Sequence, residues 1–193
     1  MIKSLKKLEK NLGYKLQDNI FCLAIDTATK SGIAFISIIK GKLNIETFVM
    51  TLPTLPKDME DKSEKYVEHL EMFNQLISDE LITRIEKSKF KEGTKLLVLE
   101  NSFLKMNVVT FGFLRALQGI AYARLRPYFG RPKIIFPITA RKLVGFKSTL
   151  PKGSKGKDKK KEICRWISNV VEEKIVEDNM ADALLLAFAG LKK

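Results

Sequence analysis

FCLAIDTATKSGIA, residues 21–34, is the stretch of sequence that decides the fold. Residues 21–25 form an almost wholly apolar run, which is typical of a strand buried on both faces, and Asp26 ends it. Small and turn-forming residues follow at 27–32, before a second β-rich run at 33–39. A buried strand that ends on a carboxylate before a tight hairpin holds that acid rigidly at an open sheet edge. A solvated turn aspartate has the same local pattern, so other parts of the chain must decide between the two.

The composition predicts one globular domain with a strongly basic surface. The chain has 193 residues, of which 45% are hydrophobic, and its net charge is +13. Such a charge indicates a polyanionic partner, nucleic acid before membrane, and no apolar run approaches the roughly 18 to 20 residues of a membrane span. Residues 1–13 lack the apolar core of an export signal. Cys22 and Cys164 have no CxxC pattern, which favours a reduced, intracellular protein.

The pattern of apolar residues predicts alternating strands and helices. We expect strands at 20–26, 33–39, 43–52, 95–99 and 133–136, and helices at 57–90, 107–129, 137–144, 158–174 and 178–191. The short connections between the first three strands require antiparallel neighbours. The fourth strand closes on Glu100, a second acid at a strand end.

Basic residues concentrate in two parts of the chain. Residues 141–161 contain nine lysines and arginines but a single acid, Asp158. Within them, 145–157 is rich in glycine, lysine, serine and proline and predicts a mobile basic loop, suited to phosphates. The lysine-rich residues 1–18 predict either a frayed helix or an arm on a phosphate backbone.

The last predicted helix opens with a further group of polar residues, in the sequence EDNMADALLLAFAG. Asp182 lies four residues after Asp178 and three after Asn179, so it shares a helix face with either one. Asp178 has a simpler interpretation as an N-cap. Asp182 lies inside the apolar run 180–189, where a carboxylate is costly unless it is paired or coordinates a metal.

These acids predict a metal site on an otherwise basic chain. Two of them end strands, and one or two more begin a helix. Clustered carboxylates repel one another, so a common site needs a hard divalent cation such as Mg²⁺. Beside a basic surface, the natural chemistry is phosphodiester hydrolysis by two metal ions about 3.5 to 4 Å apart.

Four local patterns, in this order, resemble the RuvC-type Holliday junction resolvases of the ribonuclease H-like superfamily, including phage and poxvirus relatives. The patterns are LAIDTATKSGIA, VLENSF, PITARKLVG with the following GSKGKDKKKEI, and DNMADALLLA. The resemblance implies an α/β fold: a five-stranded mixed sheet flanked by helices, with strands 1–3 antiparallel and strands 4 and 5 parallel to strand 1. Residues 20–193 would form this nuclease domain, and residues 1–19 a basic N-terminal extension.

Carried over by position, the resemblance implies metal ligands at Asp26, Glu100 and Asp182. The remaining ligand is either Asp178 or Asn179; we favour Asp178, because a charged oxygen is the stronger Mg²⁺ ligand. The catalytic lysine at the scissile phosphate falls on Lys160. Further DNA-binding residues are expected at Arg141, Lys142, Lys155, Lys157, Lys159 and Lys161. The aromatic residue that enters the junction in some members corresponds to Phe103 or Phe111, although core packing explains both equally well.

The resemblance also implies a homodimer that binds a four-way DNA junction and nicks two strands symmetrically, with two Mg²⁺ per active site and Mn²⁺ as a substitute. An intracellular, DNA-associated location follows, with a viral source among the options. Three alternatives stay open: a related nuclease acting on other branched DNA or RNA, a non-catalytic junction-binding protein, and a relative of actin-like kinases, for which 193 residues leave little room.

Overall fold

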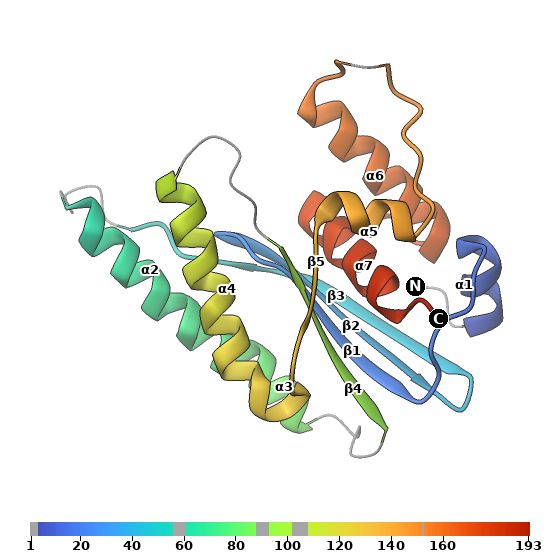
Figure 1. The fold of residues 1–193 in the computed structure, drawn as a ribbon, viewed down its shortest axis with the longest axis horizontal. Coiled ribbons are helices and arrows are strands. Elements are labelled where there is room, and N and C mark those ends of the chain that lie inside the picture. Colours follow the sequence, from blue (N-terminus) through green and yellow to red (C-terminus); the bar gives the residue numbers. More distant parts are fainter. Residues whose placement is uncertain (1–3, 56–60, 88–92, 102–107, 152) are drawn as a thin grey trace.

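The sheet has five strands in the order β3-β2-β1-β4-β5 (Figure 1). This computed structural model describes residues 4–55, 61–87, 93–101, 108–151 and 153–193. The strands are β1 (Ile20–Asp26), β2 (Lys30–Ile39), β3 (Lys42–Thr51), β4 (Thr94–Glu100) and β5 (Lys133–Ile135). β2 is antiparallel to β1 and β3, whereas β4 is parallel to β1 and β5 is parallel to β4. The predicted α/β fold with a mixed sheet is therefore confirmed.

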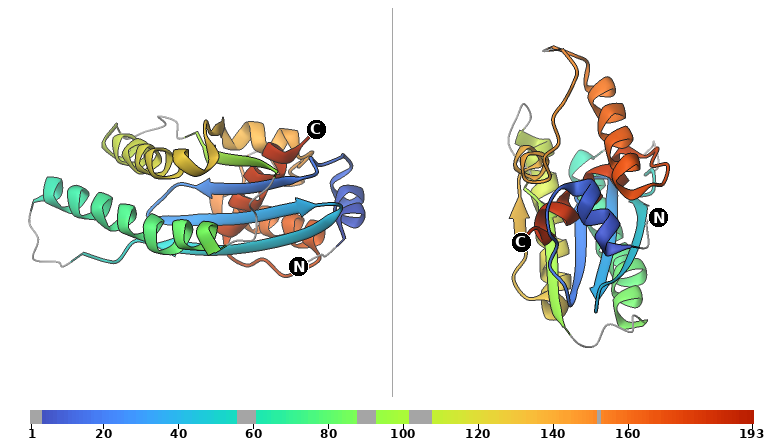
Figure 2. Two further views of the ribbon diagram at one scale, coloured as in Figure 1. Left: turned by 90° about the horizontal axis from the view of Figure 1, so that it is seen from below. Right: turned by 90° about the vertical axis from the view of Figure 1, so that its right-hand side faces the viewer.

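Helices cover both faces of the sheet (Figures 1 and 2). One layer contains α2 (Lys62–Leu76), the π-helical η1 (Ile77–Ile82), α3 (Thr83–Lys87) and α4 (Val108–Phe129); the other contains α1 (Leu5–Leu12), α5 (Pro137–Leu143), α6 (Gly156–Val171) and α7 (Asp178–Leu191). None of the helices in the described ranges is long and apolar enough to cross a membrane.

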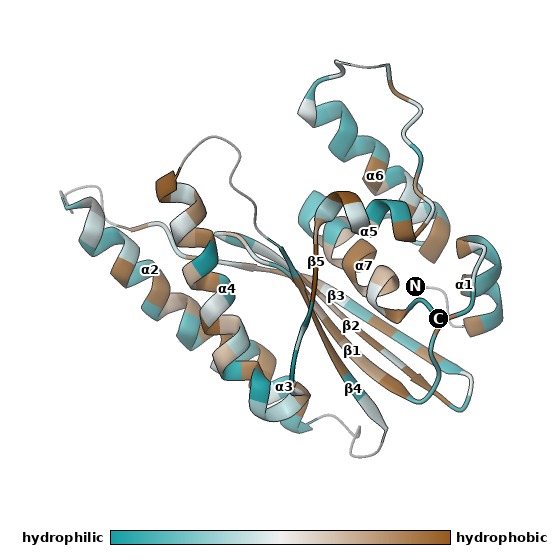
Figure 3. Cartoon of the chain, in the orientation of Figure 1, coloured by the Kyte–Doolittle hydropathy of each residue, from teal (hydrophilic) through white to brown (hydrophobic). Residues whose placement is uncertain are grey.

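Each face of the sheet has its own apolar core, and β1 contributes to both. Cys22 and Ala24 point to the layer of α7, whereas Leu23 and Ile25 point to the layer of α2 and α4. All seven residues of β1 are buried, as the apolar run predicted. Figure 3 shows the corresponding apolar colouring of β1 and α7. The strand that carries Asp26 is thus fixed from both sides.

The predicted helix at 57–90 is interrupted, in its described part, by the π-helical segment η1. Its buried residues Phe73, Ile77, Leu81 and Ile85 are spaced four apart. In a regular α-helix each step of four residues turns about 40° past a full turn, so such a row drifts around the helix. The wider π-helical turn keeps the row on the sheet.

The N-terminal segment is packed into the fold, so the expectation of a frayed helix is wrong for the described residues 4–18, whereas contact of this segment with a phosphate backbone stays a prediction. Helix α1 is capped by Ser4 and ends at Gly13 in the left-handed conformation. Its Leu8 is fully buried in the same core as α6 and α7. The amide of Asn11 donates to the carbonyl of Val170 at 3.0 Å. The boundary at residue 19 stays a prediction, but the segment before it shares the main core.

The start of the basic loop is anchored by hydrogen bonds, whereas the sequence predicted a mobile loop over the whole of 145–157. The carboxylate of Glu162 accepts hydrogen bonds from the hydroxyl and backbone N–H of Thr149 at 2.7 and 2.5 Å, and from the hydroxyl of Ser148. Helix α6 begins at Gly156, two residues before the predicted start. Lys157 therefore lies on a helix and not in the loop.

Candidate functional site

Three of the predicted acids meet at one edge of the sheet. Asp26 ends β1 and Glu100 ends the neighbouring parallel strand β4, and parallel neighbours place their carboxyl ends at the same edge. Asp182 lies on α7, which packs across β1 and β2. The charge of Asp182 acts on the carboxyl groups of both Asp26 and Glu100. The structure therefore brings Asp26, Glu100 and Asp182 to the same edge of the sheet, and their role as metal ligands stays a prediction.

Burial and mutual repulsion favour protonated carboxyl groups in this cluster. Asp26 is only 9% exposed, and burial, followed by the nearby Glu100, raises the pKa of Asp26 well above its ordinary value. Burial also raises the pKa of Glu100 and of Asp182. The interaction between the two carboxyl groups raises the pKa of Asp26 further and lowers that of Glu100, which favours a proton on Asp26.

Arg141 faces the acids, whereas Lys142 faces solvent. Arg141 comes from α5, and its Nη2 lies 3.5 Å from Oδ1 of Asp182. This guanidinium opposes the effect of burial on the pKa of Asp182. Lys142 is exposed. The two residues were predicted together as DNA contacts, and the structure separates them into one beside the carboxylates and one on the surface.

Lys160 reaches the site from α6 and pairs with Asp178 at the start of α7. The hydrogen bond from Lys160 lowers the pKa of Asp178 and raises that of Lys160. The charge of Lys160 also acts on Asp26. Lys160 is thus close to the cluster, while Asp178 lies at its margin and acts on Asp182. The choice between Asp178 and Asn179 as a metal ligand stays a prediction.

Polar groups that the sequence analysis did not single out support the acids. Gln118 on α4 is 5% exposed, and its amide donates to the backbone carbonyl of Glu100 at 2.6 Å. A glutamine inside the largely apolar run 116–123 was a signal that could have identified it. The residues directly after the two strand acids, Thr27 and Asn101, each carry a buried side-chain oxygen with no hydrogen-bond partner among the described residues.

The remaining predicted DNA contacts lie on the surface near the start of α6. Lys155, Lys157, Lys159 and Lys161 are all exposed. Phe103 lies outside the described residues. Phe111 is half-buried on α4, with the guanidinium of Arg115 5.4 Å from its ring centroid. The structure places the lysines where a polyanion can reach them and leaves the role of Phe111 a prediction.

The donor set fits a hard cation in its chemistry. Carboxylate oxygens are the ligands that Mg²⁺ prefers, and the unpartnered oxygens of Thr27 and Asn101 adjoin two of the acids. In the described part of the chain, no three acidic, histidine or cysteine side chains are already arranged around one point as ligands. Instead, Asp26 interacts with Glu100, Asp182 pairs with Arg141, and Asp178 pairs with Lys160. A bound cation would replace these partners.

Comparison with known proteins identifies the fold. No model of a protein family matches the chain, and no curated protein matches its sequence. Thermus thermophilus RuvC in complex with a Holliday junction substrate matches with a TM-score of 0.60 at 11% identity, over 88% of this chain and 91% of that one.

Two further solved structures match. A second Thermus thermophilus RuvC structure gives a TM-score of 0.59 at 14% identity, over 88% and 92% of the two chains. The yeast mitochondrial Holliday junction resolvase Ydc2 gives 0.48 at 17% identity, over 95% and 82%. The chain thus has the ribonuclease H-like fold in the form that RuvC adopts.

Proposed function

We propose that this protein is a metal-dependent endonuclease that resolves four-way DNA junctions by paired, symmetric nicks. The observation that carries this proposal is the meeting of Asp26, Glu100 and Asp182 at one sheet edge, with Arg141 and Lys160 beside them. It occurs on the fold of a protein whose solved complex contains a Holliday junction substrate.

In this proposal Asp26, Glu100, Asp182 and Asp178 hold two Mg²⁺ ions, for which Mn²⁺ can substitute. Bound metal supplies activation of a water and stabilisation of the leaving oxygen in phosphodiester hydrolysis. The raised pKa values of Asp26 and Glu100 mean that binding releases protons, because carboxyl groups ligate in their ionised form. The two carboxyl groups would then be largely buried ligands, each held in position at the end of a strand packed in the sheet.

Two cations become available to substrate when the acids take up metal. Lys160 now pairs with Asp178, and Arg141 now pairs with Asp182. If those carboxylates held metal, the side chains of Lys160 and Arg141 would be free to turn to the scissile phosphate. Arginine contacts phosphate with a planar pair of N–H groups, whereas lysine offers a compact point charge. We assign Lys160 to the phosphate that is cut and Arg141 to its orientation.

A homodimer completes the proposed function. A four-way junction has approximate two-fold symmetry, and two related copies of one site can cut it at equivalent positions. The net charge of +13 and the exposed lysines at 155–161 favour binding of the DNA backbone. An intracellular, DNA-associated location follows from this substrate, and a viral source stays a prediction.

A panel of labelled substrates tests the choice of substrate. With Mg²⁺, we expect paired nicks on a four-way junction and little turnover on a three-way junction, a flap, a linear duplex or an RNA hairpin. Faster turnover on one of the other substrates would replace the junction by that substrate and keep the nuclease. Tight junction binding with no turnover in Mg²⁺ or Mn²⁺ would instead indicate a non-catalytic junction-binding protein.

A further inference from the structure

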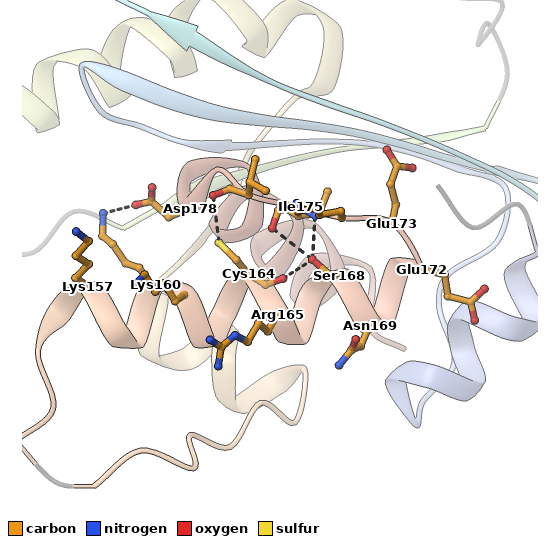
Figure 4. Close-up of a pocket in the computed structure, with 13 residues that line it drawn as sticks. Lys157, Lys160, Cys164, Arg165, Ser168, Asn169, Glu172, Glu173, Ile175 and Asp178 are labelled. Atoms are coloured by element: carbon orange, nitrogen blue, oxygen red, sulfur yellow. Dashed lines mark hydrogen bonds and ion pairs between the residues drawn. The ribbon is translucent and has the colours of Figure 1, made fainter.

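A groove of about 850 Å³ runs between α6 and the segment 172–178 that leads into α7 (Figure 4). One end of the groove is formed by Lys160 and Asp178, which also border the candidate active site. From there it follows α6 to its C-terminal end at Glu172. The groove is therefore continuous with the site but extends beyond it, along residues that the proposed chemistry does not use.

The walls of the groove carry an excess of cations. Lys157, Lys161, Arg165 and Lys174 line it and are exposed. None of these four forms an ion pair with a carboxylate in the described part of the chain. Figure 3 shows the hydrophilic character of the free end of α6. The charge of the groove is thus available to an anionic ligand.

Two of the acids along the groove are already neutralised. Glu172 pairs with Lys7 of α1 at 2.6 Å, and Asp178 pairs with Lys160. Glu173 is the other acid of the lining. Glu172 and Asp178 therefore bring their own cations and do not cancel the charge of Lys157, Lys161, Arg165 and Lys174.

The spacing of the cations fits a chain of phosphates. Lys157, Lys161 and Arg165 are four residues apart on α6 and share one face of the helix. Each step of four residues rises about 6 Å along the axis, comparable with the separation of neighbouring phosphates along a DNA strand. The rest of the lining includes the buried Cys164 and Ile175, the half-buried Ser168 and the exposed Asn169 and Val176. Apart from Ser168 and Asn169, these side chains offer no groups that read bases, so the lining suits sugar and backbone contacts.

We infer that this groove holds the phosphodiester backbone of the DNA strand on one side of the scissile phosphate, with Arg165 and Lys174 as its outer contacts. The inference rests on the proposed nuclease function, because the cut phosphate fixes where the strand enters. The groove guides a few consecutive nucleotides away from the site along α6. It acts on affinity and strand placement, not on the chemical step.

The test is a double-mutant cycle between the protein and neutral methylphosphonates in the DNA. Binding of a four-way junction is measured in EDTA, with each phosphate near the cleavage site neutralised in turn. We expect wild type to lose affinity at a short run of consecutive phosphates on one side of that site. The Arg165→Ala/Lys174→Ala variant loses no further affinity at the outer phosphates of that run and keeps the wild-type loss at the inner ones, which Lys157 and Lys161 contact. Its slope of log affinity against log salt falls by about two.

A matched variant distinguishes a specific effect of the groove on binding from a general effect of net charge. Lys87→Ala/Lys95→Ala removes two charges at the opposite end of the sheet, and we expect it to retain the wild-type phosphate profile. Arg165→Lys keeps the charge, and we expect this variant to retain the wild-type phosphate profile as well. An unchanged profile in Arg165→Ala/Lys174→Ala, or equal losses in both double variants, overturns the inference. Cleavage by wild type is scored separately, so failure of the nuclease proposal is seen as absent nicks with an intact binding profile.

Discussion

The backbone carbonyl of Asn179 lies against the α-carbon of Gly32: a Cβ at residue 32 would be 1.8 Å from that oxygen. Gly32 is paired with Asp26 across β1 and β2, and Asn179 is in the first turn of α7. The absence of a side chain at residue 32 therefore lets the start of α7, with Asp178 and Asp182, approach the strand that carries Asp26.

Gly32→Ala should push α7 away from the sheet and separate Asp182 from Asp26. Forcing a methyl group into such a contact costs about 1–3 kcal/mol of folding free energy, and we expect cleavage to fall by at least about tenfold. Urea unfolding and single-turnover cleavage measure the two effects. Gly112→Ala on α4 is the control, since nothing lies within 4 Å of its Cβ position; stability there should be equal or higher. Equal behaviour of the two variants contradicts the packing argument.

Asp26→Asn should stabilise the metal-free protein at neutral pH. The folded pKa of Asp26 is raised, so the unfolded state loses this proton first, and stability falls as pH rises from about 4, the unfolded pKa, through the folded pKa. The variant removes this penalty. In EDTA we expect its Tm at pH 7 to be at least about 2 °C above wild type, and the gain to vanish toward pH 4.

Asp178→Asn is the control for this effect, with the opposite sign. Lys160 lowers the folded pKa of Asp178, so its ionised form contributes stability that is present above the unfolded pKa and lost as pH falls through the folded pKa. The side chain is 30% exposed, which reduces the effect. Asp178→Asn should give no gain at pH 7. A similar gain in both variants would contradict the burial argument for Asp26.

Arg141→Ala should impair cleavage more than Lys142→Ala, because only Arg141 lies beside the acid cluster. We expect a loss of about tenfold or more in the single-turnover rate at saturating Mg²⁺ for Arg141→Ala. Lys142→Ala should change mainly the salt dependence of binding. Equal rates for the two variants would place Arg141 among the general DNA contacts.

Leu8→Ala should destabilise the whole domain, because Leu8 is fully buried in the core shared by α1, α6 and α7. Removing a buried leucine side chain costs about 2–5 kcal/mol. Lys10→Ala, an exposed site on the same helix, should change stability by less than about 0.5 kcal/mol. Urea unfolding with both variants checks the expectation. A small effect of Leu8→Ala would mean that α1 folds apart from the rest.

The sequence was sufficient for the sheet and for the three central acids. A strand buried on both faces is an apolar run, and an acid directly after such a run marks its end, so Asp26 and Glu100 could be placed at one edge without coordinates. Asp182 was identified because an unpaired carboxylate inside an apolar helix costs folding free energy. Each of these signals is local in the chain.

Features that depend on packing between distant segments could not be predicted in the same way. Gly32 had the pattern of a turn residue, but its role comes from the approach of Asn179. The pairing of Arg141 with Asp182 depends on how α5 and α7 meet. For α1, the apolar spacing of Leu5, Leu8 and Leu12 was a helix signal. The lysines between them equally fitted an arm on a phosphate backbone, so packing of this helix into the core could not be predicted.

The most direct measurement is cleavage of a labelled four-way junction by wild type and Asp26→Asn, in Mg²⁺ and in EDTA, with a matched linear duplex as the second substrate. We predict paired nicks by wild type on the junction alone and only with Mg²⁺, and junction binding without nicks by Asp26→Asn. Metal-independent nicking, or full activity of Asp26→Asn, would contradict the assignment of the carboxylate cluster as the catalytic metal site.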